Sequence, residues 1–228
     1  MTGDVKQIFK SINYYFMGIL SKRTLLGEGI TGKVGPLVVT KWKDKAVIKE
    51  APPKSRTNNS PKQLIQKAKF GTAIEFVRHL SGLFSVTYKL NSKKMTERNG
   101  AVGQIVSQAI TGDYPDFKID YPKVLISRGT LEPVNATVAA TAGIITWTWA
   151  PNVGINGANE LDQSVVVVYC PERKQSLYKI NAGTRIAGTA TLDVTPFVGL
   201  SVVTYLAFTT IDQKKVSDSR FTGELLVN

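Results

Sequence analysis

The segment Gly143-Ile-Ile-Thr-Trp-Thr-Trp-Ala-Pro151 has the clearest strand pattern in the chain. Its side chains alternate, so that Ile145, Trp147 and Trp149 share one face and the intervening residues share the other, as in a pleated strand. Proline ends the segment, and it lacks the N–H that a sheet needs. The pattern predicts a strand at residues 144–149 whose tryptophans lie in the core of a β-sheet domain.

Further strands are predicted on both sides of this one, separated by turns that contain glycine and proline. The predicted strands are residues 135–140, 144–149, 164–170, 175–179, 189–194, 201–209 and 216–227. Seven short strands within roughly 100 residues are typical of a β-sandwich. The sequence therefore predicts a seven-stranded sandwich over residues 131–228.

The N-terminal half predicts a β-hairpin followed by two helices. Residues 37–42 and 46–49 are β-rich runs that favour a hairpin. A first helix is predicted at residues 60–80, where Ser, Pro and Gln have the spacing of a capping box with proline at the first helical position. A second helix is predicted at residues 97–111, ended by Gly112.

Residues 113–130, before the sandwich, are predicted to be a connector with a candidate short strand at residues 124–126. Met17 offers an alternative start, which would make residues 1–16 an upstream extension of the lead-in. The predicted organisation is a lead-in at residues 1–26, a basic hairpin and two-helix region at 27–112, a connector at 113–130 and a sandwich at 131–228.

Positive charge is concentrated in the first 100 residues. They hold 19 Lys and Arg against 6 Asp and Glu, a net charge of +13, whereas residues 101–228 hold 10 against 11. Such an asymmetry favours an acidic partner such as nucleic acid, a membrane surface or an acidic protein. A lysine-rich surface that serves only solubility is an interpretation of equal weight, so both stay open.

The cysteine and histidine counts exclude several kinds of site. One cysteine, Cys170, cannot form an intrachain disulfide, and one histidine, His79, excludes a site with two histidine ligands. No segment approaches the 18 or so apolar residues of a membrane-spanning helix, and no signal peptide is recognisable. We expect a cytoplasmic or particle-associated protein that uses no metal and no cofactor.

Three segments of the predicted sandwich carry a resemblance to a known module. They are Pro133-Val-Asn-Ala-Thr-Val138, Ile144-Ile-Thr-Trp-Thr-Trp-Ala-Pro151, and Thr204-Tyr-Leu-Ala-Phe208 followed by Val216-Ser-Asp-Ser219. They resemble the opening, second and last two strands of a fibronectin type III module, which is immunoglobulin-like. The resemblance implies a binding or spacer module without an active site. The expected fold is mainly β, with a small α+β N-terminal region of a β-hairpin and two helices before a seven-stranded fibronectin-III-like β-sandwich.

A second resemblance extends over most of the chain from about Met17. The segments that carry it are Gly32-Lys-Val-Gly35 with Trp42-Lys43, Gln63-Leu64 with Lys69-Phe70, and Asp120-Tyr121 through Lys123-Val-Leu-Ile-Ser-Arg-Gly129. They are similar to an uncharacterised family of Bacteroidota proteins, a domain of unknown function. The resemblance implies membership of that family and assigns no role to any residue.

Gly27-Glu-Gly-Ile-Thr-Gly-Lys-Val34, followed by Ala46-Val-Ile-Lys49, imitates the phosphate loop and lysine of a protein kinase. A kinase also needs an aspartate beside the substrate hydroxyl, and Asp and Asn residues that bind metal ions. The chain contains no His-Arg-Asp, and Asp116-Phe117 is followed by lysine instead of glycine. We therefore interpret these glycines as turn residues and expect the protein not to be an enzyme.

Basic residues of the N-terminal half are the candidate binding site. Trp42 lies among lysines, and an aromatic ring among cations can stack on bases while the cations neutralise phosphates. The same alternation also fits a solvated lysine face opposite a core tryptophan. The possible contacts to an anion or nucleic acid are Lys41, Trp42, Lys43, Lys45, Lys54, Arg56, Lys62, Lys67 and Lys69.

Two other groups of residues have side chains that could support catalysis or bind a cation. His79 and Cys170 fall in different predicted domains, so a nucleophile pair is not expected, and Cys170 is predicted to be a small buried hydrophobe. Asp113, Asp116 and Asp120 offer carboxylates to a cation along one loop, without the pattern of a calcium loop. The sequence thus favours no metal site.

The sequence as a whole favours a non-catalytic structural or protein-interaction protein. Such a protein would act through self-assembly or through an unknown protein partner, for example as a component of a phage-like particle. The alternative is a nucleic-acid-associated protein that uses the basic N-terminal half. We expect the contacts to lie on that basic half or on the loops of the sandwich.

Overall fold

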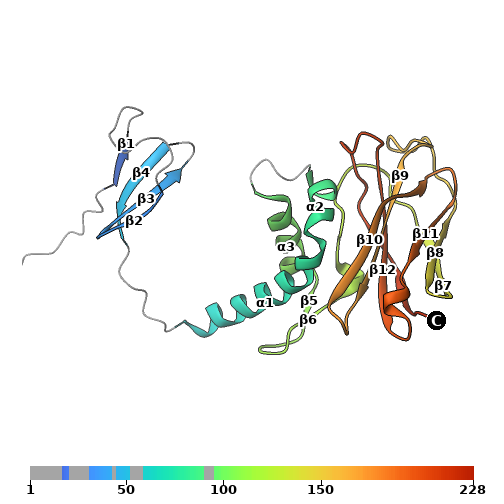
Figure 1. The fold of residues 1–228 in the computed structure, drawn as a ribbon, viewed down its shortest axis with the longest axis horizontal. Helices are drawn as coiled ribbons and strands as arrows, with labels where there is room; N and C mark the ends of the chain where they lie inside the picture. Colours follow the sequence, from blue (N-terminus) through green and yellow to red (C-terminus); the bar gives the residue numbers. More distant parts are fainter. Residues whose placement is uncertain (1–16, 21–30, 43–44, 52–58, 90–94) are drawn as a thin grey trace, which may run out of the picture. The chain divides into compact units, whose positions relative to one another are not determined.

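The computed structural model describes residues 17–20, 31–42, 45–51, 59–89 and 95–228 (Figure 1). The chain divides into two compact units, Met1–Asn58 and Asn59–Asn228, and each is described by itself. The predicted region at 27–112 is split between these units, because its helices share a hydrophobic core with the sandwich. No helix in the described ranges is both long and apolar enough to cross a membrane.

The first unit contains a four-stranded antiparallel sheet. Its strands are β1 (Met17–Leu20), β2 (Gly32–Val34), β3 (Leu37–Trp42) and β4 (Lys45–Glu50), in the order β1-β4-β3-β2. The predicted hairpin is confirmed, since β3 and β4 pair along their whole length. Sequence periodicity missed the two outer strands, which are short and lie among glycines.

The second unit begins with helices. They are α1 (Pro61–Val77), η1 (Arg78–Leu80), α2 (Ser81–Thr87) and α3 (Glu97–Gln108). The predicted capping box is confirmed: the Gln63 amide donates to Ser60 Oγ at 3.4 Å, and the Ser60 amide donates to Gln63 Oε1 at 2.9 Å. The sequence did not predict α2.

The predicted end of the second helix is wrong by three residues. The helix stops at Gln108, because the carbonyl of Ala109 accepts from the Asp120 amide at 2.9 Å. That bond adjoins a small hairpin of β5 (Ile110–Thr111) and β6 (Lys118–Ile119). Gly112, with φ of +85°, therefore turns this hairpin and does not cap the helix.

The sandwich has the seven strands that the sequence predicts. They are β7 (Ala136–Thr141), β8 (Ile144–Trp149), β9 (Gln163–Cys170), β10 (Gln175–Thr184), β11 (Thr189–Asp193), β12 (Ser201–Thr209) and β13 (Arg220–Leu226). One sheet has the order β10-β9-β12-β13, and the other has the order β11-β8-β7. Residues 124–126 form no strand, although Val124 and Ile126 are buried. The fold is mainly β, as predicted.

The core between the two sheets contains the tryptophan face from which the fold was predicted. Ile145, Trp147 and Trp149 are buried there with the inward residues of β9 and β12. The Trp147 indole donates to Thr222 Oγ1 on the opposite sheet at 3.1 Å, and the Trp149 ring meets the Phe208 ring edge-on at 5.3 Å. These residues therefore join the two sheets.

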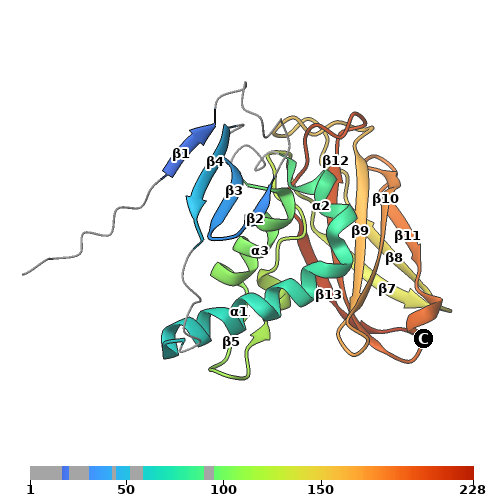
Figure 2. The ribbon, with the colours of Figure 1, turned by 60° about the vertical axis from the view of Figure 1, so that its left-hand side comes forward.

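A second core lies on the other side of the β10-β9-β12-β13 sheet. The helices, this sheet and the three-stranded sheet form successive layers, which Figures 1 and 2 show from two directions. Phe76 of α1 contacts Tyr169 of β9, with ring centroids 4.7 Å apart. Because β9 faces a core on each side, every residue of Ser164–Cys170 is buried. Two short helices, η3 (Tyr121–Lys123) and η4 (Thr195–Phe197), also belong to the described part of this unit.

Candidate functional site

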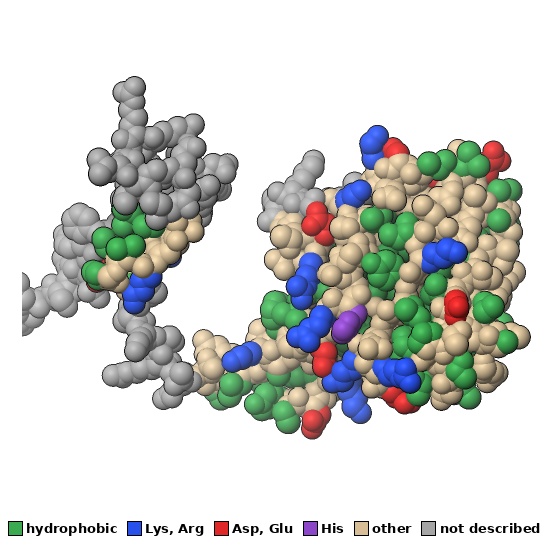
Figure 3. Space-filling view, in the orientation of Figure 1, with side chains coloured by type: hydrophobic (Ala, Val, Ile, Leu, Met, Phe, Trp, Pro, Cys, Tyr) green, Lys and Arg blue, Asp and Glu red, His purple; other side chains and the backbone are tan. Residues whose placement is uncertain are grey.

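Exposed aliphatic side chains gather on the loops at one end of the sandwich, which we call the loop end. This end is formed by residues 150–162 between β8 and β9, residues 185–188 between β10 and β11, and residues 210–219 between β12 and β13. Between 43% and 64% of each of these side chains is exposed: Val153, Ile155, Leu161, Ile186 and Ile211. The upper edge of the sandwich in Figure 3 shows apolar side chains among charged ones.

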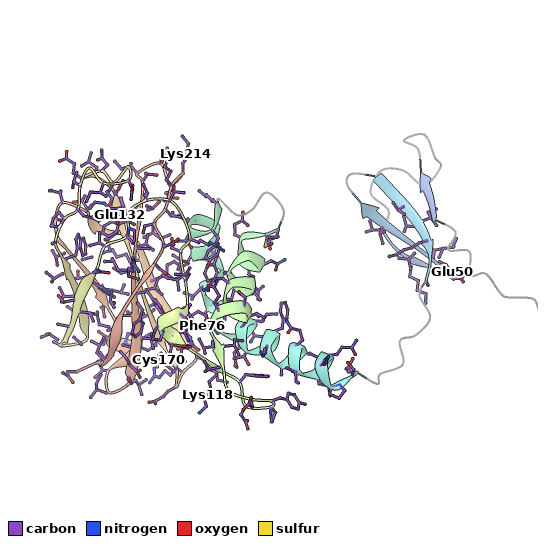
Figure 4. All side chains as sticks on the ribbon, turned by 180° about the vertical axis from the view of Figure 1, so that it is seen from behind. Glu50, Phe76, Lys118, Glu132, Cys170 and Lys214 are labelled. Atoms are coloured by element: carbon purple, nitrogen blue, oxygen red, sulfur yellow. The ribbon has the colours of Figure 1, made fainter. Side chains whose placement is uncertain are left out.

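Hydrogen bonds tie the β8–β9 loop to the β10–β11 turn and to the segment before β7. The Ile186 amide donates to the carbonyl of Glu160 at 3.1 Å, so the β10–β11 turn lies beside the end of the β8–β9 loop. Asn156 Nδ2 donates to Glu132 Oε2 at 2.6 Å, which ties the same loop to the segment before β7. Glu132 and Lys214 lie at the same end of the sandwich, and Cys170 lies toward the other (Figure 4).

A buried arginine lies beneath the loop end. Arg185 Nε donates to Asp162 Oδ2 at 3.2 Å, and Nη1 donates to Asn152 Oδ1 at 2.5 Å. Nη1 and Nη2 also donate to the carbonyl of Glu132, each at 3.2 Å. The guanidinium carbon lies 4.2 Å from the centroid of the Phe208 ring. One side chain therefore joins the approach to β7, both ends of the β8–β9 loop and strand β12.

The charge of Arg185 is compensated inside the protein. Burial lowers the pKa of this guanidinium, and the charge and hydrogen bond of Asp162 act in the opposite direction. Asp162 Oδ2 also accepts the Asn159 amide at 2.9 Å, and the carbonyl of Arg185 accepts the Trp149 indole N–H at 2.9 Å. Arginine stays protonated in proteins, so the loops close around a permanent buried ion pair.

Cys170 and His79, the residues that the sequence offers as a nucleophile pair, lie in different surroundings. Cys170 is buried between the two sheets, as predicted for a small hydrophobe. His79, purple in Figure 3, is exposed in η1 between α1 and α2, and its carbonyl accepts from Ser176 Oγ at 3.3 Å. Ser164 Oγ is the buried side-chain polar atom without a hydrogen-bond partner in the described part of the chain, and a lone hydroxyl is not a catalytic group.

The acidic loop does not assemble a cation site in the described residues. No group of three or more His, Cys, Asp or Glu side chains there could hold a metal ion. Asp113 and Asp116 are exposed, and Asp120 pairs with Lys123, with Oδ2 2.6 Å from Nζ. Asp120 therefore has a structural partner within its own 3₁₀ turn.

The predicted contacts to an anion or nucleic acid are spread over both units. Lys43, Lys54 and Arg56 lie outside the described residues. Lys41, Trp42 and Lys45 belong to β3 and β4, where the structure gives their backbone positions alone. Three others lie on α1 of the second unit, namely Lys62, Lys67 and Lys69. The prediction that all nine form one site stays a prediction.

Two of the lysines on α1 are exposed, and the third has a partner. Lys62 and Lys67 face solvent. Lys69 is half-buried, and its ammonium lies 5.2 Å from the centroid of the Phe117 ring in the β5–β6 loop. Such a cation–π contact stabilises the packing of α1 against that loop. Lys69 is therefore less available to an outside anion than its neighbours.

The comparisons with known proteins identify a family whose function is unknown. Residues 29–223 match the model of a family of unknown function, DUF6266. This match covers well over half of the chain, so the chain belongs to that family, which confirms the predicted domain of unknown function. A comparison with proteins whose functions have been curated finds no match.

Proposed function

We propose that this member of the DUF6266 family is a non-catalytic protein-interaction module that binds a protein surface through its loop end. The observation that carries the proposal is the set of five exposed aliphatic side chains at the loop end, four of which lie on the two loops joined by Arg185. Apolar side chains that gather on a monomer surface typically mark an interaction site. The surface would be used for assembly with further copies or with another protein.

Preorganisation of the loops supports this role. Ordering a mobile loop on binding costs free energy, and loops that are already fixed avoid much of that cost. The Arg185 contacts fix both ends of the β8–β9 loop, on which Val153 and Ile155 lie. A central apolar cluster with a polar rim is the usual anatomy of an interface, and Glu160 and Lys214 are exposed beside the cluster.

The sandwich type is part of the same proposal. Two antiparallel sheets with buried tryptophans on β8 support a fibronectin-III-like module, and sandwiches of the immunoglobulin class bind partners through the loops at their ends. A non-catalytic role is supported by the separate surroundings of Cys170 and His79. Kinship with Bacteroidota proteins is likewise proposed from the sequence resemblance.

A pair of matched double variants tests the role of the loop end. Ile155→Asp with Ile186→Asp places two charges in the proposed interface. Val198→Asp with Leu226→Asp makes the same change at the opposite end, where these side chains are similarly exposed. Light scattering of the full chain over a range of concentrations measures self-association. A photo-crosslinking residue at position 155 or 198 captures other partners in cells that produce the protein.

The proposal expects association or crosslinking that only the loop-end change removes. A self-associating wild type should become monomeric in the first variant and stay associated in the second. If the wild type is a monomer, crosslinks should form from position 155 and not from 198. Equal behaviour of the two ends in both measurements would overturn the proposal.

A further inference from the structure

The sheet of the first unit has two different faces, which follow from its strand register. Val38 of β3 pairs with Lys33 of β2 on one side and with Lys49 of β4 on the other. Trp42 pairs directly with Lys45. Paired residues share a face, and a strand returns to the same face every second residue. One face, which we call the basic face, therefore contains Lys33, Lys45 and Lys49 around the apolar residues Val38, Trp42 and Val47, of which Val47 is buried.

The opposite face has another composition. Val34 pairs with Leu37, which in turn pairs with Glu50, and all three lie on the face away from Trp42. Val34 and Leu37 are 66% and 45% exposed. Lys41 shares their face, because it is an even number of residues from Leu37. The register therefore separates Lys41 from Trp42 and Lys45, although the three are close in sequence.

The basic face suits a polyanion on grounds of charge. Lys33 and Lys49 are exposed, and residues 1–58 hold 11 Lys and Arg against 4 Asp and Glu. Complementary charge steers an anionic partner to such a unit, and like charge opposes pairing with a second copy of it. An anion is therefore the occupant that the charge of the unit favours.

The spacing and the aromatic residue favour a single strand of nucleic acid. Strands lie about 4.8 Å apart, so Lys33 and Lys49, on either side of β3, have backbones about 10 Å apart. Lys45 is four residues from Lys49 along β4, or about 13 Å at the rise of a strand. Cations that track a backbone, together with an aromatic residue for the bases, are characteristic of proteins that bind single strands. A duplex keeps its bases stacked and gives Trp42 no role.

We propose that the basic face of the β1–β4 sheet binds single-stranded nucleic acid. Lys33, Lys45 and Lys49 neutralise phosphates, and Trp42 supplies the aromatic residue. This activity belongs to the first unit and does not depend on the function proposed for the loop end of the second.

Fluorescence anisotropy of the full chain with a labelled oligo(dT) of about 20 nucleotides tests the proposal. The wild type should bind at about 50 mM salt and weaken steeply toward about 200 mM, because phosphate contacts release counterions. Lys33→Glu with Lys49→Glu should lower the affinity at the lower salt by about tenfold or more. Their loss should also reduce the slope of log K against log salt by about 1.4, since each phosphate contact on a single strand contributes about 0.7.

A matched control changes the same charge elsewhere. Lys118→Glu with Lys179→Glu reverses two exposed lysines of the second unit and should leave the affinity within about threefold of wild type, as expected for charges that make no contact with the bound strand and are screened by salt. Lys33→Gln with Lys49→Gln, which removes charge without adding acid, should weaken binding in the same direction as the glutamates. Far-UV circular dichroism checks that each variant keeps its strand content.

Three results would overturn the proposal. One is the absence of oligo(dT) binding by the wild type at the lower salt. Another is an equal loss of affinity in the two charge-reversal variants, which would mean that binding depends on the net charge of the chain and not on the basic face. The third is competition by poly-glutamate as effective as that by unlabelled oligo(dT), which would indicate an acidic protein surface as the partner.

Discussion

The guanidinium of Arg185 and the carboxylate of Asp162 meet inside the sandwich, with Nε 3.2 Å from Oδ2 and both side chains shielded from solvent. Removing one partner would leave the other charge buried and uncompensated. We expect Asp162→Ala to lower the free energy of unfolding by about 3–5 kcal/mol, measured by urea denaturation.

Two further variants distinguish the effect of an unpaired buried charge from that of losing any ion pair or packed side chain. Lys174→Ala breaks the exposed pair of Lys174 with Glu75 and should cost at most about 1 kcal/mol. The double replacement Arg185→Met with Asp162→Leu should cost less than Asp162→Ala, because no charge is then left unpaired. Similar losses for the buried and the exposed pair would contradict the prediction.

Gly129 lies against the segment that leads into β13. A Cβ at this position would be 1.9 Å from the carbonyl oxygen of Val216, the atom that accepts the Leu131 amide at 3.0 Å. Gly129→Ala must separate these segments, and we expect it to cost about 3 kcal/mol or more. Gly103→Ala is the control, because its Cβ meets nothing within 4 Å; on helix α3 it should gain about 0.4–1 kcal/mol. Thermal unfolding of both variants measures the contrast.

Ser60 stabilises the first turn of α1 through the capping box. Ser60→Ala should cost about 1 kcal/mol. Because the first turns of α1 are exposed, this loss should appear as local fraying more than as a lower unfolding temperature. Hydrogen exchange of the amides at residues 62–64 should become faster in Ser60→Ala and stay slow in Ser60→Asp, which can still cap the helix. Equal exchange in all three proteins would show that the cap contributes little.

Four tyrosines around the helical core make the second unit sensitive to alkali. Burial raises the pKa of Tyr88, Tyr121, Tyr169 and Tyr205 above the usual 10. The folded state therefore keeps these protons, while the unfolded chain releases them near pH 10. Since the unfolded state then binds fewer protons, the contribution of these tyrosines to the free energy of unfolding should be constant below about pH 10 and fall as the pH rises further.

Denaturation at about pH 8 and about pH 10.5 measures this loss, with tyrosinate absorbance as a second signal. Tyr205→Phe removes one ionisable group and the hydrogen bond from Tyr205 Oη to the carbonyl of Tyr121 at 3.0 Å. This variant should be less stable at the lower pH and lose less of its stability on alkalisation. The same alkaline loss as in wild type would exclude Tyr205 from the effect.

The sequence predicted those parts of the fold that are decided by local pattern. Strands β8 and β12 match the predicted ranges, and the cap of α1 lies where Ser60 and Gln63 indicated it. The helical layer was not predicted to cover the sandwich, because periodicity does not identify the partner of an apolar surface. One signal was available: Val165-Val-Val-Val-Tyr-Cys170 shows no alternation, which is typical of a strand with both faces buried.

The sequence predicted that the sandwich loops are one place where a partner could bind, but it did not predict which residues of the loop end would form the contact. Arg185 is one of 29 Lys and Arg. No local sequence pattern distinguishes an arginine that will be buried and paired with Asp162, 23 positions earlier in the chain. Val153 and Ile155 carried a weak signal, because aliphatic residues within a turn rich in Asn and Gly have no strand to join. The two faces of the N-terminal sheet required the register, which alternation in a single strand does not give.

The burial of β9 on both faces sets a limit on how this protein can be divided. A recombinant fragment that begins at residue 131 would contain all seven strands of the sandwich. It would also present Val165, Val167 and Tyr169 to water, since their covering helices would be missing. Such a fragment is expected to aggregate, whereas one that begins at Asn59 keeps the whole unit. The exchangeable module for fusion proteins is thus longer than its strand count suggests, and its cutting point precedes the cap of α1.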